Sequence, residues 1–346
     1  MERCCYNSGV KETSDLRLME LRAGAEDAGE RLDRFVAVRC TELSRTRVKE
    51  LIEAEKILVN GKAAKGATKL RGGEVIRVQA EERPALRAEA EDVPLQVLYE
   101  DEDVLVVNKP AGMTVHAGAG LARGTLVNAL LGRGQSLSRS GDALRPGIVH
   151  RLDKETSGAI VIAKNDFAHA RLAEAFRARE VEKTYIALVE GELGESRGRI
   201  ELAIARDPKR RVRMTARRTA ALSRSRHART DWTRLLTIGP TTLVEVQLHT
   251  GRTHQIRVHF SATHHPVVGD ALYGGSAKLR VGKTSMPALE RNFLHAARLA
   301  FAQPRTGNEI RVTAPLPGDL HEYLRRLGAE AEVEPGRIDG VLTSFL

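Results

Sequence analysis

The stretch His150-Arg151-Leu152-Asp153-Lys154-Glu155-Thr156-Ser157-Gly158 places a carboxylate between two cations and closes in a Thr-Ser-Gly turn. It follows residues 147–149, a short apolar run that is typical of a strand. Arg151 and Lys154 favour the charged form of Asp153, and a tight loop holds its side chain in place. We therefore interpret Asp153 as a candidate catalytic acid. The alternative is a solvated turn whose charges only satisfy one another.

Short apolar runs on both sides of this stretch predict further strands. They cover residues 95–99, 104–107, 148–149, 159–163, 184–189, 243–248, 293–301 and 310–313. Helices are predicted over 166–179 and 320–327, where apolar residues recur with helical spacing. Several strands are joined by turns too short for a helical crossover, which predicts antiparallel pairing. The expected fold class is therefore α+β, with a mixed, mostly antiparallel sheet and flanking helices.

A small basic unit precedes this sheet. Apolar spacing predicts a helix from Glu30 and a second helix capped by Ser44, followed by strands at 57–59 and 74–78 with a turn at Asn60-Gly61. The organisation expected for the whole chain is a flexible lead over 1–26, this αα-β module over 27–80, a linker over 81–92, the larger unit over 93–330 and a C-terminal tail over 331–346.

Composition excludes several classes of protein. The chain has 346 residues, 42% of them apolar, and a formal charge of +10. No run approaches the ~18 apolar residues of a membrane span, and the start lacks the apolar core of a signal peptide, so we expect a soluble, cytoplasmic protein without a membrane partner. The three cysteines, Cys4, Cys5 and Cys40, suit neither a disulfide framework nor a spaced zinc site.

Positive charge is concentrated in one segment. Residues 206–230 hold ten lysines and arginines against one acid, Asp207. We interpret this basic stripe as a contact for the phosphates of a nucleic acid. A solvated, mobile surface is the alternative.

Three further clusters lie in the larger unit. Residues 108–113, Asn-Lys-Pro-Ala-Gly-Met, predict a sharp turn whose backbone can approach a ligand. Residues 183–185, Lys-Thr-Tyr, open a strand. Residues 250–257, Thr-Gly-Arg-Thr-His-Gln-Ile-Arg, follow a strand, and Thr253 is expected to cap a helix that aims Arg257 away from the core. The histidines lack the spacing of metal ligands, so no metal is predicted.

With these residues in view, the chain resembles the RluA-type RNA pseudouridine synthases that modify large-subunit ribosomal RNA and carry an S4 RNA-binding domain. The matching motifs are residues 108–112, 147–158, 183–191 and 251–259, and Gly269-Asp270 with Tyr273-Gly274. In the small unit, Arg31-Leu32-Asp33, Ser44-Arg45, Val59-Asn60-Gly61 and residues 73–76 match the S4 pattern. The stretch 220–229 departs from the family's usual short loop.

The resemblance implies an isomerase that detaches uracil from C1′ of a uridine, turns the base and rejoins it through C5, without a cofactor. Asp153 would be the essential acid, either attacking C1′ or assisting proton removal from the sugar. Arg257 would pair with it, Tyr185 would stack on uracil and relay the C5 proton, and Arg151 would fill the gap left by a flipped nucleotide. The expected substrate and RNA contacts are Arg151, His150, Lys183, Arg31, Arg45, Arg47, Lys49, Arg210, Arg211 and Arg213.

Two rival interpretations stay open. Asp153 and Glu155 could be the paired carboxylates of a glycosidase, although aromatic residues form only 4% of the chain. Alternatively, the protein could be an RNA-binding or assembly factor with an idle catalytic fold. The expected partner is RNA, with 23S ribosomal RNA, within or outside an assembling subunit, as the expected substrate and transfer RNA still open. We expect a monomer.

Overall fold

The computed structural model describes residues 16–40, 43, 45–81, 89–116, 123–134, 137–138, 145–208, 210, 212–217 and 225–345. The chain divides into two compact units, Met1–Leu86 and Arg87–Leu346, and the division falls inside the predicted linker. Within the described ranges, no helix combines the length and the apolar character that a membrane crossing needs.

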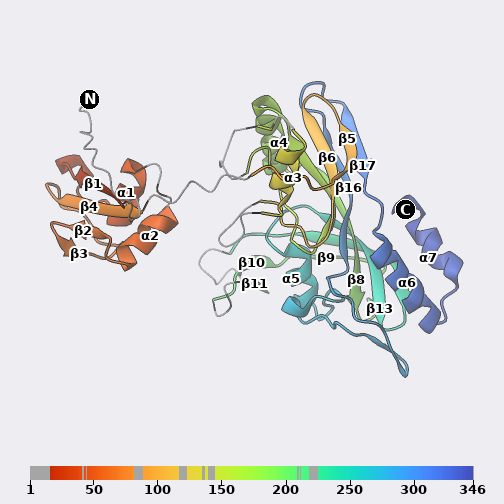
Figure 1. The fold of residues 1–346 in the computed structure, drawn as a ribbon. Coiled ribbons are helices and arrows are strands. Elements are labelled where there is room, and N and C mark those ends of the chain that lie inside the picture. Colours follow the sequence, from red (N-terminus) through yellow and green to blue (C-terminus); the bar gives the residue numbers. More distant parts are fainter. Residues whose placement is uncertain are drawn as a thin grey trace. The chain divides into compact units, whose positions relative to one another are not determined.

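The first unit is a small four-stranded antiparallel sheet with two helices (Figure 1). Its elements are β1 (Leu16–Arg22), η1 (Ala25–Asp27), α1 (Leu32–Arg39), α2 (Arg45–Glu53), β2 (Ile57–Val59), β3 (Lys62–Ala63) and β4 (Val75–Glu81). The strand order is β1-β4-β2-β3. Asn60 and Gly61 both have positive φ, as a type I′ turn requires.

Strand β1 corrects the prediction of a flexible lead over residues 1–26 for the part from Leu16 onward, and residues 1–15 lie outside the described residues. It pairs with β4 along its whole length, and Met19 and Leu21 pack against the core of the unit. Leu18 is 70% exposed. The adjacent apolar residues Leu18 and Met19 interrupt the alternation that marks a strand in sequence, which is why the pattern missed it.

The second unit is built on a nine-stranded sheet. The strands of the whole unit, including four that lie outside this sheet, are β5 (Gln96–Glu100), β6 (Val104–Lys109), β7 (Ser157–Ala163), β8 (Glu182–Glu190), β9 (Arg197–Ile200), β10 (Ala203–Arg206), β11 (Met214–Arg217), β12 (Thr230–Ile238), β13 (Thr241–Leu248), β14 (Arg280–Val281), β15 (Thr284–Ser285), β16 (Leu294–Ala302) and β17 (Glu309–Thr313). Its helices are α3 (Leu126–Gly132), α4 (Asp166–Ala178), α5 (Gln255–Ala262), η2 (Ala271–Tyr273), α6 (Gly318–Glu330), α7 (Pro335–Leu342) and η3 (Thr343–Phe345).

The large sheet has the order β5-β6-β7-β16-β8-β13-β12-β9, and β17 pairs with β16. Strands β10 and β11 form a separate hairpin, as do β14 and β15. Among the described strands, β7 and β16 are the one parallel pair. The α+β class and the mostly antiparallel sheet are therefore confirmed. Residues 148–149, predicted as a strand, contribute only a single bridge between Ile148 and Ile162.

Strand β7 is covered on both faces within the second unit. Ile160 and Ile162 belong to the main core together with Leu126 of α3, whereas Val161 packs on the opposite side with Leu172 of α4. Every residue of β7 is buried. The Asp153 loop ends directly in this strand, so its C-terminal end is anchored in a fully buried part of the second unit.

Gly158 allows β7 to approach β16. Its φ is 121°, and a Cβ atom at this position would collide with the backbone of Ala296. Glycine is the residue that tolerates both the conformation and the close contact. The Gly that ends the quoted stretch therefore has a structural reason to be there.

The predicted C-terminal tail is also corrected. Residues 335–342 form α7, and Ile338, Leu342 and Phe345 are almost fully buried in the main core. Helices α6 and α7, in blue in Figure 1, end the chain beside the sheet. Pro335 and the glycines at 336 and 340 weaken the helical signal of this segment, which explains the incorrect prediction.

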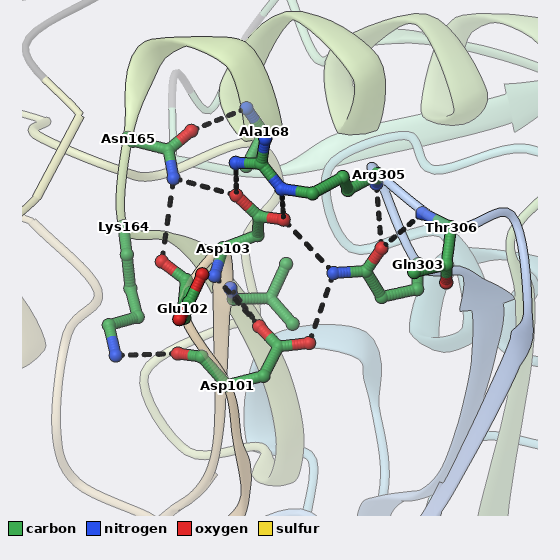
Figure 2. A network of polar contacts seen from close by, with 10 residues as sticks. Asp101, Glu102, Asp103, Lys164, Asn165, Ala168, Gln303, Arg305 and Thr306 are labelled. Atoms are coloured by element: carbon green, nitrogen blue, oxygen red, sulfur yellow. Dashed lines mark hydrogen bonds and ion pairs between the residues drawn. The ribbon is translucent and has the colours of Figure 1, made fainter.

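A polar network joins three turns at one edge of the second unit (Figure 2). Asp103 is 1% exposed and receives two hydrogen bonds from the guanidinium of Arg305, at 2.8 and 3.0 Å. Gln303 and Asn165 donate to the same carboxylate, and Gln303 also donates to Asp101. The network ties the β5–β6 turn to the start of α4 and to the β16–β17 turn.

Candidate active site

A pocket of about 410 Å³ opens beside the Asp153 loop. Its walls come from residues 149–153, the C-terminal end of α4, the start of β8 and the segment from the end of β13 into α5. Asp153, Tyr185 and Arg257 all line it, although they come from sequence positions far apart. The volume is within the range of about 300–1,000 Å³ that is usual for small-molecule sites.

Asp153 contacts a cation at hydrogen-bond distance. Nη1 of Arg257 donates to its Oδ2 at 3.1 Å, and Nε2 of His254 lies 3.8 Å from its Oδ1. The loop turns at this residue, because the N–H of Thr156 donates to the Asp153 carbonyl. The side chain keeps 16% of its surface exposed, so the carboxylate is both held and accessible from the pocket.

Arg257 is fixed by a second carboxylate. Its Nε and Nη2 donate to the two oxygens of Asp270 at 2.6 and 2.8 Å, and Asp270 is 2% exposed. Burial works against the charge of Arg257, but the bonds to Asp270 and the proximity of Asp153 outweigh it and raise the pKa of the guanidinium. Arg257 is therefore a permanent, oriented cation beneath Asp153.

The start of α5 differs from the prediction. The helix begins at Gln255, and its N-cap is His254 in the left-handed conformation, with φ 56°, so Thr253 is not the cap. Arg257 is 9% exposed and does not point outward to solvent. The sequence could not reveal this, because the partner that draws Arg257 inward, Asp270, lies in a turn after the helix.

Tyr185 presents its ring to the same pocket from β8. It is 7% exposed, and burial, followed by the charge of Asp153, raises the pKa of its hydroxyl above the ordinary value of 10.0. The hydroxyl is therefore neutral at physiological pH and retains a proton to donate.

Lys109 holds the Asp153 loop from below, a role that the sequence did not reveal. Its side chain is completely buried, and Nζ donates to the carbonyls of Pro110, Met113 and Lys154 at 2.8 to 3.1 Å. Burial, with a contribution from Arg291, lowers the pKa of Lys109 to about 7. The turn at 108–113 thus positions the loop through a side chain as well as through its backbone.

His150 and Lys183, both predicted to contact substrate, form one wall of the pocket with Phe176. The His150 ring stacks on Phe176 with a centroid separation of 4.5 Å, and its Nε2 accepts the N–H of Val161. Burial, and then the charge of Lys183, lowers the pKa of His150 to about 3, so the ring is neutral. Nζ of Lys183 lies 5.6 Å from the Phe176 ring centroid, and burial lowers its pKa.

Cations surround the pocket mouth. Arg151 is exposed there, and Arg177, Arg179 and Arg252 line the same opening without having been predicted. Burial lowers the pKa of Arg252, and the nearby charges of Arg226 and Arg179 lower it further. Arg252 lies inside the quoted 250–257 motif, so its position could have been noticed from sequence.

The remaining predicted RNA contacts are spread over both units. Arg31 makes a bidentate ion pair with the buried Asp33, and Lys49 is exposed on α2. Arg210 is exposed in the β10–β11 turn, and the guanidinium of Arg213 lies 5.2 Å from the Tyr273 ring centroid. The side chains of Arg45 and Arg47, and all of Arg211, lie outside the described residues.

The glycosidase interpretation does not fit this geometry. Glu155 lines a different pocket, with Ala111, Gly112 and Arg291, and is not among the residues around Asp153. Paired carboxylates of a glycosidase must flank one bond of the same substrate.

Comparison with known proteins identifies the class of enzyme. Residues 103–262 match the family described as RNA pseudouridylate synthase, and residues 30–76 match the S4 domain. The chain is 40% identical to the uncharacterized RNA pseudouridine synthase YlyB of Bacillus subtilis, over 89% of this chain and 98% of that protein. It is 42% identical to the ribosomal large subunit pseudouridine synthase D of Xanthomonas campestris, over 87% of this chain and 89% of that protein.

A solved structure agrees. Human RNA pseudouridylate synthase domain containing 1 superposes with a TM-score of 0.51 at 32% identity, covering 66% of this chain and 86% of that one. The chain therefore belongs to the RNA pseudouridine synthases, with an S4 RNA-binding domain at its N-terminal side. This confirms the predicted family, the isomerase class and RNA as the partner.

Proposed function

We propose that this RNA pseudouridine synthase isomerises uridines of large-subunit ribosomal RNA, with Asp153 as its catalytic carboxylate. The observation that carries the proposal is the 3.1 Å contact between Asp153 and the doubly anchored Arg257, in a pocket that Tyr185 also lines. The name of the Xanthomonas campestris relative supports ribosomal RNA as the substrate.

The chemistry acts at C1′ of a uridine that leaves the RNA stack and enters the pocket. In one role Asp153 attacks C1′, the bond from C1′ to N1 breaks, and uracil leaves with the electron pair. In the other role Asp153 removes a proton from the sugar to allow the same cleavage. The base then turns. In the first role C5 bonds to C1′ as the bond between Asp153 and C1′ breaks, and in the second role C5 bonds to C1′ as Asp153 returns the proton to the sugar. In both roles the C5 proton departs and N1 gains a proton, so that substrate and product are isomers.

Arg257 and Tyr185 divide the remaining tasks. Arg257 offsets the negative charge of Asp153 and orients its carboxylate, since Asp270 fixes the guanidinium plane. Tyr185 stacks on the uracil and relays the C5 proton, because an aromatic ring with a neutral hydroxyl supplies both functions.

The rim cations hold the RNA while the base is out of the stack. Extruding a nucleotide costs a few kcal/mol of lost stacking. Arg151, exposed at the mouth, inserts its planar guanidinium into the gap. Arg179 and Arg252, which line the same opening, bind the neighbouring phosphates.

Two variants of the same loop test the catalytic assignment. Asp153→Asn should abolish conversion of uridine to pseudouridine in ribosomal RNA, while the Kd for RNA stays within about twofold, because the shape and the RNA contacts remain. Glu155→Gln is the matched control, two residues away and facing another pocket, and should keep most of the activity. Turnover by Asp153→Asn, or loss of turnover in Glu155→Gln alone, contradicts the assignment.

The substrate is tested by mapping pseudouridines across total RNA from cells with and without this protein. The expected result is loss of specific sites in large-subunit ribosomal RNA. Sites lost only from transfer RNA would reject the ribosomal part of the proposal and leave the catalytic part intact.

A further inference from the structure

Tyr273 lies between the proposed catalytic residues and the basic β10–β11 hairpin. It follows Asp270 in the tight turn 269–275, where a Cβ on Gly275 would collide with the backbone at Val267. The residue is 2% exposed, and its carbonyl accepts a hydrogen bond from Ser261 of α5. Its position is therefore set by the same turn that fixes Arg257.

The Tyr273 hydroxyl contacts two segments at once. The N–H of Met214, the first residue of β11, donates to it at 2.8 Å. On the other side the hydroxyl lies 2.9 Å from Nδ1 of His254. Since Nε2 of His254 faces the Asp153 carboxylate, the ring proton belongs on Nε2, and Nδ1 accepts the Tyr273 O–H. Hydrogen bonds thus connect the hairpin to Tyr273 and Tyr273 to His254, and Nε2 of His254 lies 3.8 Å from Oδ1 of Asp153.

The Tyr273 ring is also held between two arginines. The guanidinium carbon of Arg213, on the hairpin, lies 5.2 Å from the ring centroid, and that of Arg257 lies 5.0 Å from it. Ile204 of β10 and Val258 of α5 complete a small apolar cluster around the ring. Tyr273 therefore contacts both the β10–β11 hairpin and the arginine of the Asp153–Arg257 pair.

The backbone of His254 has an unusual conformation. It occupies the left-handed region at φ 56°, a conformation that non-glycine residues rarely adopt. Such a conformation persists only where the surroundings determine it, and it is common at functional sites. The hydrogen bond from Tyr273 is one of the contacts that hold the imidazole against Asp153.

We propose that Tyr273 is a positioning residue that ties the β10–β11 hairpin to Asp153 through His254, so that the hairpin and the catalytic carboxylate keep a fixed relation when RNA binds. The inference rests on the proposed function and deepens it. It assigns to the GDALYGG turn a task that none of the predicted catalytic residues performs.

The test compares two tyrosines that lose only a hydroxyl. Tyr273→Phe should lower kcat at least about tenfold, because small displacements of a catalytic group are costly, while Kd for RNA and KM change less than about twofold. Tyr323→Phe is the matched control. Tyr323 is also buried, and its hydroxyl has no hydrogen-bond partner in the described residues, so its kcat should equal that of the wild type.

A double-mutant cycle separates positioning from a general loss of stability. His254→Asn keeps a side chain that tolerates the left-handed conformation but removes the imidazole. If Tyr273 acts through His254, the double variant Tyr273→Phe/His254→Asn should be no slower than the slower single variant. Hydrogen exchange at the Met214 amide should accelerate in Tyr273→Phe and stay unchanged in Tyr323→Phe.

Three results would overturn the proposal: wild-type kcat in Tyr273→Phe, effects of the two substitutions that multiply, or unchanged exchange at Met214. If the single variant does not fold, His254→Asn alone must still show the kcat loss with an intact KM. Wild-type enzyme that converts no uridine in any RNA would instead reject the proposed function, so the two failures are distinguishable.

Discussion

The Asp153 pocket and the β10–β11 hairpin use arginine in opposite ways. Arg257 is 9% exposed and bonded to two carboxylates, whereas the side chain of Arg210, in the β10–β11 turn, is exposed to solvent. A buried, fully bonded arginine fixes the geometry of a reaction, and its effect is little screened by salt. An exposed, unpaired arginine attracts phosphate and depends strongly on salt.

The largest effect is expected at the buried end of this comparison. Arg257→Gln should lower kcat about a hundredfold or more, because it removes the cation that orients Asp153. It also leaves Asp270 buried without its partner, which should cost about 3–5 kcal/mol of unfolding free energy. Both effects are measured by single-turnover kinetics and by urea unfolding.

Arg326→Gln on α6 is the control for that substitution. Arg326 pairs with Glu322 one helical turn away, and its side chain is 59% exposed. Stability and kcat should stay close to those of the wild type, since exposed pairs contribute little. Equal losses in the two variants would remove the distinction between buried and exposed arginines.

A smaller effect is expected at the hairpin. Changing Arg210, Arg211, Arg217 and Arg218 together to glutamine should weaken RNA binding about tenfold at moderate salt and flatten the plot of log K against log salt concentration. Arg211, Arg218 and the side chain of Arg217 lie outside the described residues, so this prediction rests on the sequence. The measurement is a binding titration at several salt concentrations.

The same number of neutral substitutions at paired arginines controls for net charge. Arg133, Arg311, Arg325 and Arg326 all pair with carboxylates in the second unit. Their replacement should leave the salt slope unchanged. If the hairpin substitutions leave the salt slope unchanged, the basic stripe is a solvated surface that does not contribute to RNA binding.

The smallest effect concerns a third kind of arginine, half exposed but bonded to a buried acid. The hydrogen bonds from Arg305 are the main reason that the pKa of Asp103 falls from 3.8 to about 2 (Figure 2). Because the folded pKa is the lower one, the stability from this carboxylate is present above about pH 4 and is lost as the pH falls toward 2.

Asp103→Asn should therefore lower the melting temperature by a few degrees at pH 7 and reduce the acid sensitivity between pH 4 and 2. The kcat should stay unchanged, since the network lies away from the pocket residues. Thermal unfolding of the wild type and the variant from pH 7 to pH 2 measures the change in melting temperature and in acid sensitivity. An unchanged acid profile would show that other carboxylates dominate acid unfolding.

Sequence patterns predicted the parts of the fold whose signal is local. Strand β7, for example, is a continuous apolar run, and α4 has regular helical spacing. The missed elements have irregular signals: β1 has two adjacent apolar residues, and α7 contains two glycines. Their stability comes from pairing with β4 and from burial in the main core, which a local pattern does not contain.

In the candidate active site, too, local sequence motifs identified some features and missed those that depend on the tertiary fold. Motifs identified Asp153, Tyr185 and Arg257, and the structure brings all three to one pocket. Lys109 and Tyr273 also lie in these motifs, but their supporting contacts were missed, because Lys109 donates to the Lys154 carbonyl and Tyr273 contacts His254 across long sequence separations. Supporting contacts of this kind depend on the tertiary fold alone.

The most direct test of the account is a structure of Asp153→Asn bound to a ribosomal RNA fragment that contains a target uridine. We expect the uridine to lie in the pocket with C1′ about 3–3.5 Å from the residue 153 side chain. Its base should lie against Tyr185, and Arg151 should occupy the position that the base left in the RNA stack. A uridine that remains stacked in the RNA, or that binds away from residue 153, would contradict it.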